Sequence, residues 1–171
     1  MNNYQKLAFV FFSFVFVNPT FGQICRDQIP ESTPTEQFEV HDDGTVSDTK
    51  TGLMWQRCNV GQNWDGNTCS GFGGWFSVHE IFNVAKQSET AGYDDWRLPN
   101  FKELFSIVET SCRQPAINAV IFPNTSSNLH WTSTPSIETT GQFHQVFFQD
   151  GQTGDFWTSS SRVRLVRDVQ D

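Results

Sequence analysis

Four of the six tryptophans stand in polar or glycine-rich stretches, where an exposed ring could contact a ligand. They are Trp64, Trp75, Trp131 and Trp157. An aromatic ring in a polar loop can stack on a sugar ring or fill a protein interface. For any one of them burial beneath a loop is the commoner outcome, because tryptophan is highly buried on average. The neighbours His130 and Trp131 are the pair most suggestive of a binding role.

The side chains that could catalyse a reaction form no recognisable set. No serine stands in a G-x-S-x-G motif, and HExxH, phosphate-loop and dinucleotide-binding motifs are absent from the sequence. A cysteine could act as a nucleophile beside a histidine, but an exported chain keeps its cysteines in disulfides. The carboxylate pairs Asp42–Asp43 and Asp94–Asp95 stand in turns, where aspartate is favoured for backbone reasons. We therefore predict a protein without catalytic activity, with a divergent enzyme as an alternative.

Calcium is the metal that the remaining oxygen-bearing side chains could bind. Asp150, Asp155 and Asn124 would supply hard oxygen ligands if the loops brought them together. A hairpin turn at Asp150–Gly151 is the simpler explanation of the first of these residues. We predict no cofactor and no metal site, and calcium binding stays open as the alternative.

The four cysteines, Cys25, Cys58, Cys69 and Cys112, indicate two disulfides in an exported chain, although their number leaves the connectivity open. Cys58 and Cys69 flank a segment rich in glycine, asparagine and aspartate, so a bond between them would close a turn-rich loop. The metal-binding alternative lacks both CxxC spacing and clustered histidines. We predict the bonds Cys58–Cys69 and Cys25–Cys112.

Residues 1–22 are typical of a secretory signal peptide. Lys6 precedes an apolar run over residues 7–17, and Thr20 and Gly22 provide small residues at the cleavage site. The run is shorter than the ~20 residues of a membrane-spanning helix, so no stable anchor is expected after cleavage. Residues 23–171 then form one domain by length. We expect the protein to be secreted, periplasmic or on the cell surface.

The charge of the chain is acidic, with a formal net charge of −8. Lys6 is the only charged residue in the signal peptide, so cleavage makes the net charge more negative by one. A negative chain disfavours nucleic acids and other polyanions as partners. The best local basic patch is formed by Arg162, Arg164 and Arg167.

The segment Asp94–Asn100 organises the predicted fold, because an extended stretch ends at Pro99 and a helix begins just behind it. A residue before proline is held in extended conformations, so Trp96 and Leu98 alternate on one buried side. Asn100 is a suitable N-cap whose helix presents an apolar face at helical spacing, made of Phe101, Leu104, Phe105 and Val108. Trp55, beside apolar neighbours on another strand, is also predicted to be core.

The rest of the chain alternates short strands with turns. Residues 23–37 are polar, contain two prolines and form an irregular lead-in. A second helix is expected to begin at a capping box between Ser77 and Glu80 and to end near Gly92. Residues 111–137 are expected to be loop. Strands are predicted at residues 38–40, 45–47, 53–56, 145–148 (the first arm of a hairpin reaching Trp157) and 163–167. Two helices among short antiparallel strands indicate the α+β class.

Several motifs carry a family resemblance over residues 38–167. They are Asp43-Gly44-Thr45-Val46, Asp48 to Gln56, Asp95 to Asn100 with Lys102-Glu103-Leu104, Pro115 to Asn118, Phe122-Pro123-Asn124, Trp131 to Pro135, and Val163 to Arg167. In this order they resemble the C-terminal domain family of the Legionella collagen-like adhesin, the Lcl C-terminal domain family. The resemblance implies a C-type-lectin-like fold, related to the formylglycine-generating enzymes, over residues 38–171. Such a fold has two helices, short twisted antiparallel sheets and a long loop region.

The resemblance also implies an exported, non-catalytic binding domain that recognises a glycan or another surface ligand. The named family member is a trimeric adhesin for sulfated glycans, but this chain lacks collagen-like repeats and is acidic. A protein-interaction or assembly subunit of the cell envelope is the alternative. C-type-lectin-like domains bind through the long loop region, here residues 114–157. That region implies a ligand site made of Asn124, Asn128, His130, Trp131, Asp150, Asp155 and Trp157.

Overall fold

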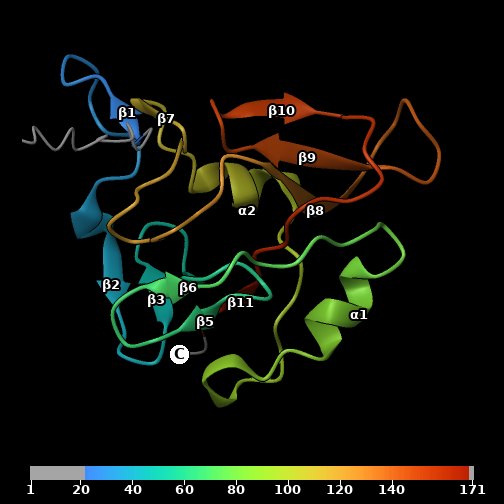
Figure 1. Ribbon diagram of the computed structural model, residues 1–171, viewed down its shortest axis with the longest axis horizontal. Coiled ribbons are helices and arrows are strands. Elements are labelled where there is room, and N and C mark those ends of the chain that lie inside the picture. Colours follow the sequence, from blue (N-terminus) through green and yellow to red (C-terminus); the bar gives the residue numbers. More distant parts are fainter. Residues whose placement is uncertain (1–21, 170–171) are drawn as a thin grey trace, which may run out of the picture.

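The computed structural model describes residues 22–169 and consists of two short helices and several small antiparallel sheets (Figure 1). The predicted signal peptide lies outside this range except for its last residue, Gly22. Within the described range no helix has the length and apolar character needed to cross a membrane. The mixed helices and antiparallel sheets confirm the α+β class.

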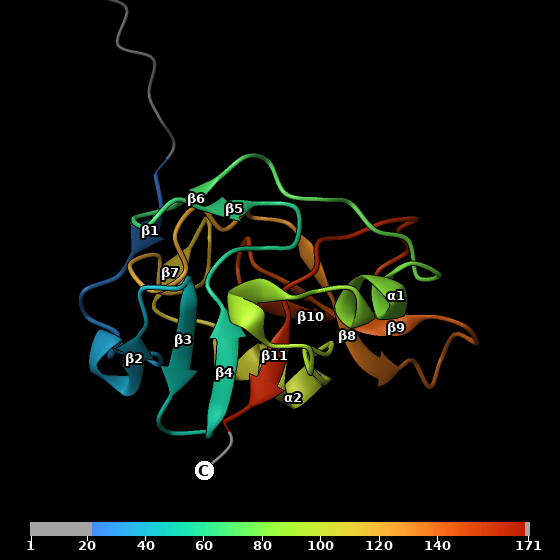
Figure 2. The same ribbon diagram turned by 90° about the horizontal axis from the view of Figure 1, so that it is seen from below.

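A four-stranded antiparallel sheet places the last strand of the chain beside three strands from residues 38–56 (Figure 2). Its order is β11-β4-β3-β2, and its strands are β2 (Phe38–Val40), β3 (Thr45–Asp48), β4 (Leu53–Gln56) and β11 (Val166–Asp168). The predicted hairpin is present, with Gly44 at its tip in the left-handed conformation that glycine adopts easily, φ +86°. The closing strand begins later than predicted, because Val163 and Leu165 pack into the core and their carbonyls accept hydrogen bonds from Val60 and Gln56.

A three-stranded sheet of order β10-β9-β8 forms the other end of the molecule. Its strands are β8 (Leu129–Pro135), β9 (Phe143–Phe147) and β10 (Gln152–Gly154). The hairpin of β9 and β10 confirms the second predicted hairpin, but β8 replaces part of the predicted loop 111–137. The loop prediction was wrong here because polar residues of β8 are buried. His130 and Thr132 are both fully covered, so the strand shows no simple apolar alternation.

Two strand pairs of two residues each lie beside the two disulfides. Strand β1 (Ile24–Cys25) pairs with β7 (Cys112–Arg113), and Cys25 is bonded to Cys112. Strand β5 (Asn63–Trp64) pairs with β6 (Cys69–Ser70), and Cys69 is bonded to Cys58. Both predicted disulfides are thus confirmed, and the described residues include no free cysteine. The lead-in is irregular apart from β1 and a single 3₁₀ turn at Thr35–Gln37.

Helix α2 (Phe101–Ser106) begins as the sequence predicts. The Asn100 side chain accepts a hydrogen bond from the Glu103 amide at 3.0 Å, and the Glu103 carboxylate accepts one from the Asn100 amide at 2.7 Å. This reciprocal capping box satisfies two amides that a helix start leaves without partners. Leu104 and Val108 are buried as expected, whereas Phe105 is 41% exposed.

Helix α1 (Ile81–Lys86) is shorter than the predicted helix from Ser77 to Gly92. The Ser77 hydroxyl and amide both donate to the Glu80 carboxylate. Residues 77–80, predicted as the first turn of the helix, therefore form a turn that precedes α1 and is not part of it. The chain then leaves the helix at Gln87, and Thr90–Gly92 form a 3₁₀ turn with Gly92 at φ +77°. The predicted capping box at Ser77 was therefore wrong, because the N-cap of α1 is Glu80, one turn later, and makes no side-chain capping hydrogen bond.

The four-stranded sheet separates two clusters of buried side chains. Along β4, Leu53 and Trp55 face one cluster and Met54 faces the other, as the alternation of a strand requires. The first cluster packs against α2 and the segment around Ile117, and the second packs against α1. Trp55 is completely buried, as predicted.

The organising segment behaves as the sequence predicts. Trp96 and Leu98 are 3% and 4% exposed, and the Trp96 indole donates to the Thr90 carbonyl at 3.0 Å. Arg97 pairs with Val166 through two backbone hydrogen bonds, and its side chain turns away to Glu103 and Asp168. The segment therefore holds the last strand against the start of α2.

A buried carboxylate attaches the lead-in to the domain. Glu109 is 2% exposed and accepts hydrogen bonds from the amides of Ser32, Thr33 and Ser111. Burial alone would raise the pKa of this carboxyl, but the hydrogen bonds outweigh burial and lower the pKa to about 2.

The first prediction concerns Trp96. Replacing Trp96 with alanine removes a buried ring and should cost roughly 3–5 kcal/mol of the free energy of unfolding. Urea unfolding of the purified protein measures this change. Trp157→Ala is the matched control, because that ring is 84% exposed and its loss should leave the unfolding free energy unchanged. Equal stabilities of the Trp96 variant and the parent would contradict the burial.

The second prediction concerns pH. The pKa of Glu109 is lower in the folded chain than its ordinary value of 4.5, so its stabilisation is complete above pH 4.5. That contribution should be lost as the pH falls from 4.5 toward 2. Thermal melts across this range should show a weaker pH dependence in Glu109→Gln than in the parent. Glu39→Gln, at an exposed position, is the control and should keep the parent profile.

Candidate functional site

Arg164 is completely buried and holds together the segments that form the candidate site described below. Its guanidinium donates to the Gln56 and Arg57 carbonyls and to the Thr125 hydroxyl, and it lies 4.8 Å from the centre of the Phe122 ring. Burial lowers the pKa of Arg164 to about 9, so the group stays protonated at neutral pH. The buried cation fixes the strand end at Gln56 relative to the loop at Thr125.

Two further arginines bind backbone carbonyls and stack on tryptophan rings. Arg57 donates to the Ile121 and Val120 carbonyls and lies 4.3 Å from the centre of the Trp64 ring. Arg162 donates to the Gly73 and Gly74 carbonyls and lies 4.2 Å from the centre of the Trp75 ring. We call Arg57, Arg162 and Arg164 the arginine clamps, because each joins segments distant in sequence through backbone acceptors.

These contacts correct the predicted basic patch. Arg162, Arg164 and Arg167 are all buried, and Arg167 forms an ion pair with Asp95 at 2.6 Å. Arginine combines five donors with a flat face, and here both properties hold loops together. The three cations therefore do not form a surface for a polyanion.

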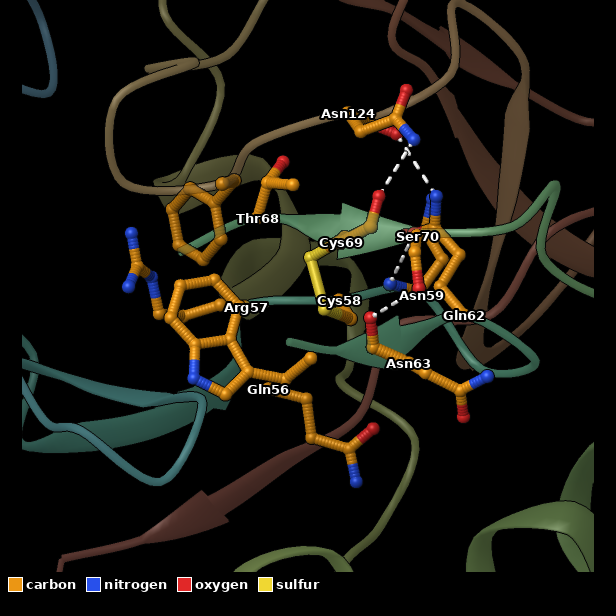
Figure 3. Close-up of a disulfide and its surroundings, with 12 residues drawn as sticks. Gln56, Arg57, Cys58, Asn59, Gln62, Asn63, Thr68, Cys69, Ser70 and Asn124 are labelled. Carbon is orange, nitrogen blue, oxygen red and sulfur yellow. Dashed lines mark hydrogen bonds between the residues drawn. A yellow bond between two sulfur atoms is a disulfide. The ribbon is translucent and has the colours of Figure 1, made fainter. Parts of the chain in front are cut away.

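The disulfide loop, residues 58–69, is held by amide side chains (Figure 3). The Asn124 side chain donates to the Cys69 carbonyl at 2.7 Å, and the Gln62 side chain donates to the Asn124 carbonyl at 3.1 Å. The Gln62 carboxamide oxygen accepts from the Asn59 amide at 2.9 Å. Gln62 and Asn124 therefore connect the loop to the segment that follows Phe122.

The inner cavity lies on one side of the disulfide loop, has a volume of about 220 Å³ and is lined mainly by polar groups. Four neutral carboxamides line it, together with a tryptophan ring and two hydroxyl side chains. These residues are Gln56, Asn59, Gln62, Asn63, Trp64, Ser88 and Thr90. Trp64 packs on the hairpin tip, where a Cβ added to Gly44 would lie 2.7 Å from the indole. Only glycine allows the ring to sit this close.

The outer cavity lies on the other side of Gln62 and has a volume of about 350 Å³. Its lining residues are Gln62, Gly71, Phe72, Asn124, Ser126 and Arg162. Phe72 is 94% exposed, so its ring is free to contact a ligand. Among the described residues, the buried Ser126 hydroxyl and Arg162 Nε have no hydrogen-bond partner. Gln62 lines both cavities, and we treat the two cavities on either side of it as one candidate site beside the disulfide loop.

His130 supports this site from below and does not take part in it. The imidazole is fully buried, with Nε2 3.1 Å from the Asn59 carboxamide and Nδ1 3.0 Å from the Asn128 carbonyl. Burial, and then the positive charges of Arg164 and Arg162, lower the pKa of His130 to about 3. The ring is therefore neutral at physiological pH and orients Asn59 at the cavity wall.

The predicted ligand residues do not form one surface. Trp131 is 1% exposed and donates to the Phe76 carbonyl at 2.7 Å, so like His130 it cannot contact a ligand. Its ring belongs to the second core cluster, which is the commoner outcome for tryptophan, so its predicted place in the ligand site was wrong because the indole donor finds a partner inside the fold. Asn124 lines the outer cavity. The Asn128 carbonyl accepts a hydrogen bond from the Phe148 amide inside the fold.

The three remaining predicted residues contact different partners. Asp150 is exposed and accepts a hydrogen bond from the Gln152 amide in the turn between β9 and β10. Asp155 contacts His144 at 2.5 Å and also accepts a hydrogen bond from Ser136. Trp157 is exposed on the loop that follows β10. Within residues 22–169 no group of three or more His, Cys, Asp or Glu side chains could hold a metal ion.

Sequence reasoning missed Gln56, Asn59, Gln62, Asn63 and Phe72. One signal was available, because the segment between Gln56 and Asn67 is dense in carboxamides and is followed by two exposed aromatics in a glycine-rich run. The cavity walls also come from residues near 44, 88 and 124, which no local pattern brings together.

The fold and site define a disulfide-stabilised α+β domain with two cavities beside one loop, the inner one lined by neutral polar groups. The Lcl C-terminal domain model matches residues 44–167, so the chain belongs to the Lcl C-terminal domain family. Searches of curated proteins and of solved structures returned no match. Family membership points to an extracellular, adhesin-like domain, and the two disulfides indicate an oxidising, non-cytoplasmic compartment.

The third prediction concerns the bond that shapes the site. Replacing Cys58 and Cys69 together with alanine should lower the free energy of unfolding by roughly 3 kcal/mol, because the open loop gains entropy when unfolded. Urea unfolding under oxidising conditions measures the loss. Asn67→Ala, at an exposed position inside the same loop, should unfold like the parent. A double variant as stable as the parent would show that the bond does not constrain the loop.

Proposed function

We propose that this protein is an exported, non-catalytic binding domain for a neutral, hydroxyl-rich ligand such as an oligosaccharide. The observation that carries the proposal is the pair of adjacent cavities lined by carboxamides, hydroxyls, the partly buried Trp64 ring and the exposed Phe72 ring. Carboxamides can donate to and accept from sugar hydroxyls at once, and aromatic rings can cover the apolar face of a sugar. The disulfide and the arginine clamps hold these groups in place before a ligand arrives.

The charges of the site favour a neutral ligand over a sulfated polymer. Among the residues lining the two cavities only Arg162 is charged, and Gly73, Gly74 and Trp75 already engage its guanidinium. The net charge of −8 adds long-range repulsion of polyanions. These features support a ligand recognised by hydrogen bonds rather than by ion pairs.

Binding without catalysis is supported by the chemistry of the lining residues. Carboxamides do not transfer protons at neutral pH, and His130 behind the wall is buried and neutral. The two cysteines of the loop are joined in a disulfide. A C-type-lectin-like assignment is part of the proposal, supported by β2 and β11 lying in one sheet. The ligand site predicted from the sequence lay within residues 114–157 alone. The site proposed here takes only Asn124 and Ser126 from that region and adds the disulfide loop.

The fourth prediction tests the ligand and its position. The purified mature protein should bind neutral oligosaccharides on a glycan array and should bind heparin poorly at physiological salt. Phe72→Ala and Asn63→Ala should each lower the affinity for the best ligand about tenfold, as measured by calorimetry, which is equivalent to about 1.4 kcal/mol of binding free energy. Both side chains line a cavity and are exposed, so the variants should melt like the parent.

Gln152→Ala is the matched control, because this exposed carboxamide lies on β10 and lines neither cavity. Its affinity should equal that of the parent. Tight, salt-sensitive heparin binding without neutral-glycan binding would reject the ligand class. Chemical-shift mapping that placed the ligand away from residues 56–64 and 71–75 would reject the site.

A further inference from the structure

Two large apolar side chains stand almost fully in solvent on neighbouring loops at one end of the three-stranded sheet. Ile137 is 94% exposed on the loop between β8 and β9, and Trp157 is 84% exposed on the loop that follows β10. Because β9 and β10 are antiparallel, the start of β9 and the end of β10 lie at the same end of their hairpin. We call Ile137 and Trp157 the apolar loop tips. Neither residue lines the candidate ligand site.

A shared carboxylate fixes the bases of the two loops. Asp155 accepts a hydrogen bond from the Ser136 hydroxyl, and its other oxygen lies 2.5 Å from Nδ1 of His144. The Asp155 side chain is 12% exposed, so this contact is largely covered. Ser136 also accepts hydrogen bonds from the amides of Glu138 and Thr139, which shapes the turn that carries Ile137. The polar contacts of Asp155 with Ser136 and His144 thus hold the bases of both loops together.

The charge around the loop tips has one sign. No lysine or arginine stands between Arg113 and Arg162, whereas Glu138 is exposed beside Ile137. The lysines of the two helices are not part of the two loops. Lys86 lines a cavity with Arg97, and Lys102 lines another with Thr51 and Asp168. Residues 114–161, which carry both loop tips, therefore combine protruding apolar side chains with an exposed carboxylate and contain no lysine or arginine.

We propose that the apolar loop tips dock a basic protein segment that also carries apolar side chains. A tryptophan on a rigid loop is a frequent anchor of protein interfaces, because it buries a large area at little cost in conformational entropy. Lysine or arginine side chains on the partner would complement Glu138 and speed association. An anionic membrane surface carries the same sign of charge as this end and is disfavoured as the occupant.

The experiment uses the purified mature protein and a fluorescent synthetic peptide of alternating lysine and leucine. Binding is followed by fluorescence anisotropy, with a peptide of alternating glutamate and leucine as the charge-reversed probe. Ile137→Ser and Trp157→Ser should each lower the affinity for the basic peptide about tenfold. Val120→Ser is the matched control, because Val120 is 70% exposed outside the two loops. That variant should bind like the parent.

The outcomes separate a specific surface from general attraction to an acidic protein. Loss of affinity in the two loop-tip variants, with Val120→Ser unchanged, supports the proposal. Equal loss in all three variants, or no loss in any, overturns it. Equal binding of the acidic peptide overturns the charge argument. Preferred binding to vesicles of phosphatidylcholine and phosphatidylglycerol would assign the loop tips to a membrane instead and overturn the proposal too.

Discussion

The burial of the Arg164 cation is the constraint on which the rest of this structure depends. A charged group without contact with water must find acceptors in the fold, and here these are the Gln56 and Arg57 carbonyls and the Thr125 hydroxyl. Satisfying the cation fixes the end of β4, the entry to the disulfide loop and the loop after Phe122 at one point. The two cavities exist because these three segments cannot move independently.

Local signals in the sequence predicted the elements, and partners distant in sequence decided the rest. The capping box at Asn100, the hairpin at Gly44, the Cys58–Cys69 bond and the core role of Trp96 each have a local sequence signal, and all are confirmed. The Cys25–Cys112 bond is also confirmed, although it joins residues 87 positions apart. Strand β8 was missed because its buried polar residues are satisfied from elsewhere. Thr132, for example, donates to the His144 carbonyl.

The candidate site shows the same division more sharply. Trp131 stands in a polar stretch of the sequence and Trp75 in a glycine-rich one, yet the first is buried and the second is half exposed. The difference comes from the Phe76 carbonyl, which accepts from the Trp131 indole, and from Arg162, which stacks on Trp75. Neither contact has a signature in the sequence, because both join residues that are more than 50 positions apart. Residue type alone could therefore name the aromatic candidates without separating core from surface.

The bond between Cys25 and Cys112 has a mechanical consequence. A pulling force between the two ends of the chain passes directly through this covalent bond, so the backbone between the two cysteines, 87 positions apart, carries no tension. That protected stretch contains β2, β3, β4, both helices and the disulfide loop. Only the chain beyond Cys112 can be drawn out, and it includes β8, β9 and β10. A domain tethered at one end and loaded at the other would thus lengthen through β11 and the three-stranded sheet, while the backbone of the disulfide loop stayed unstretched.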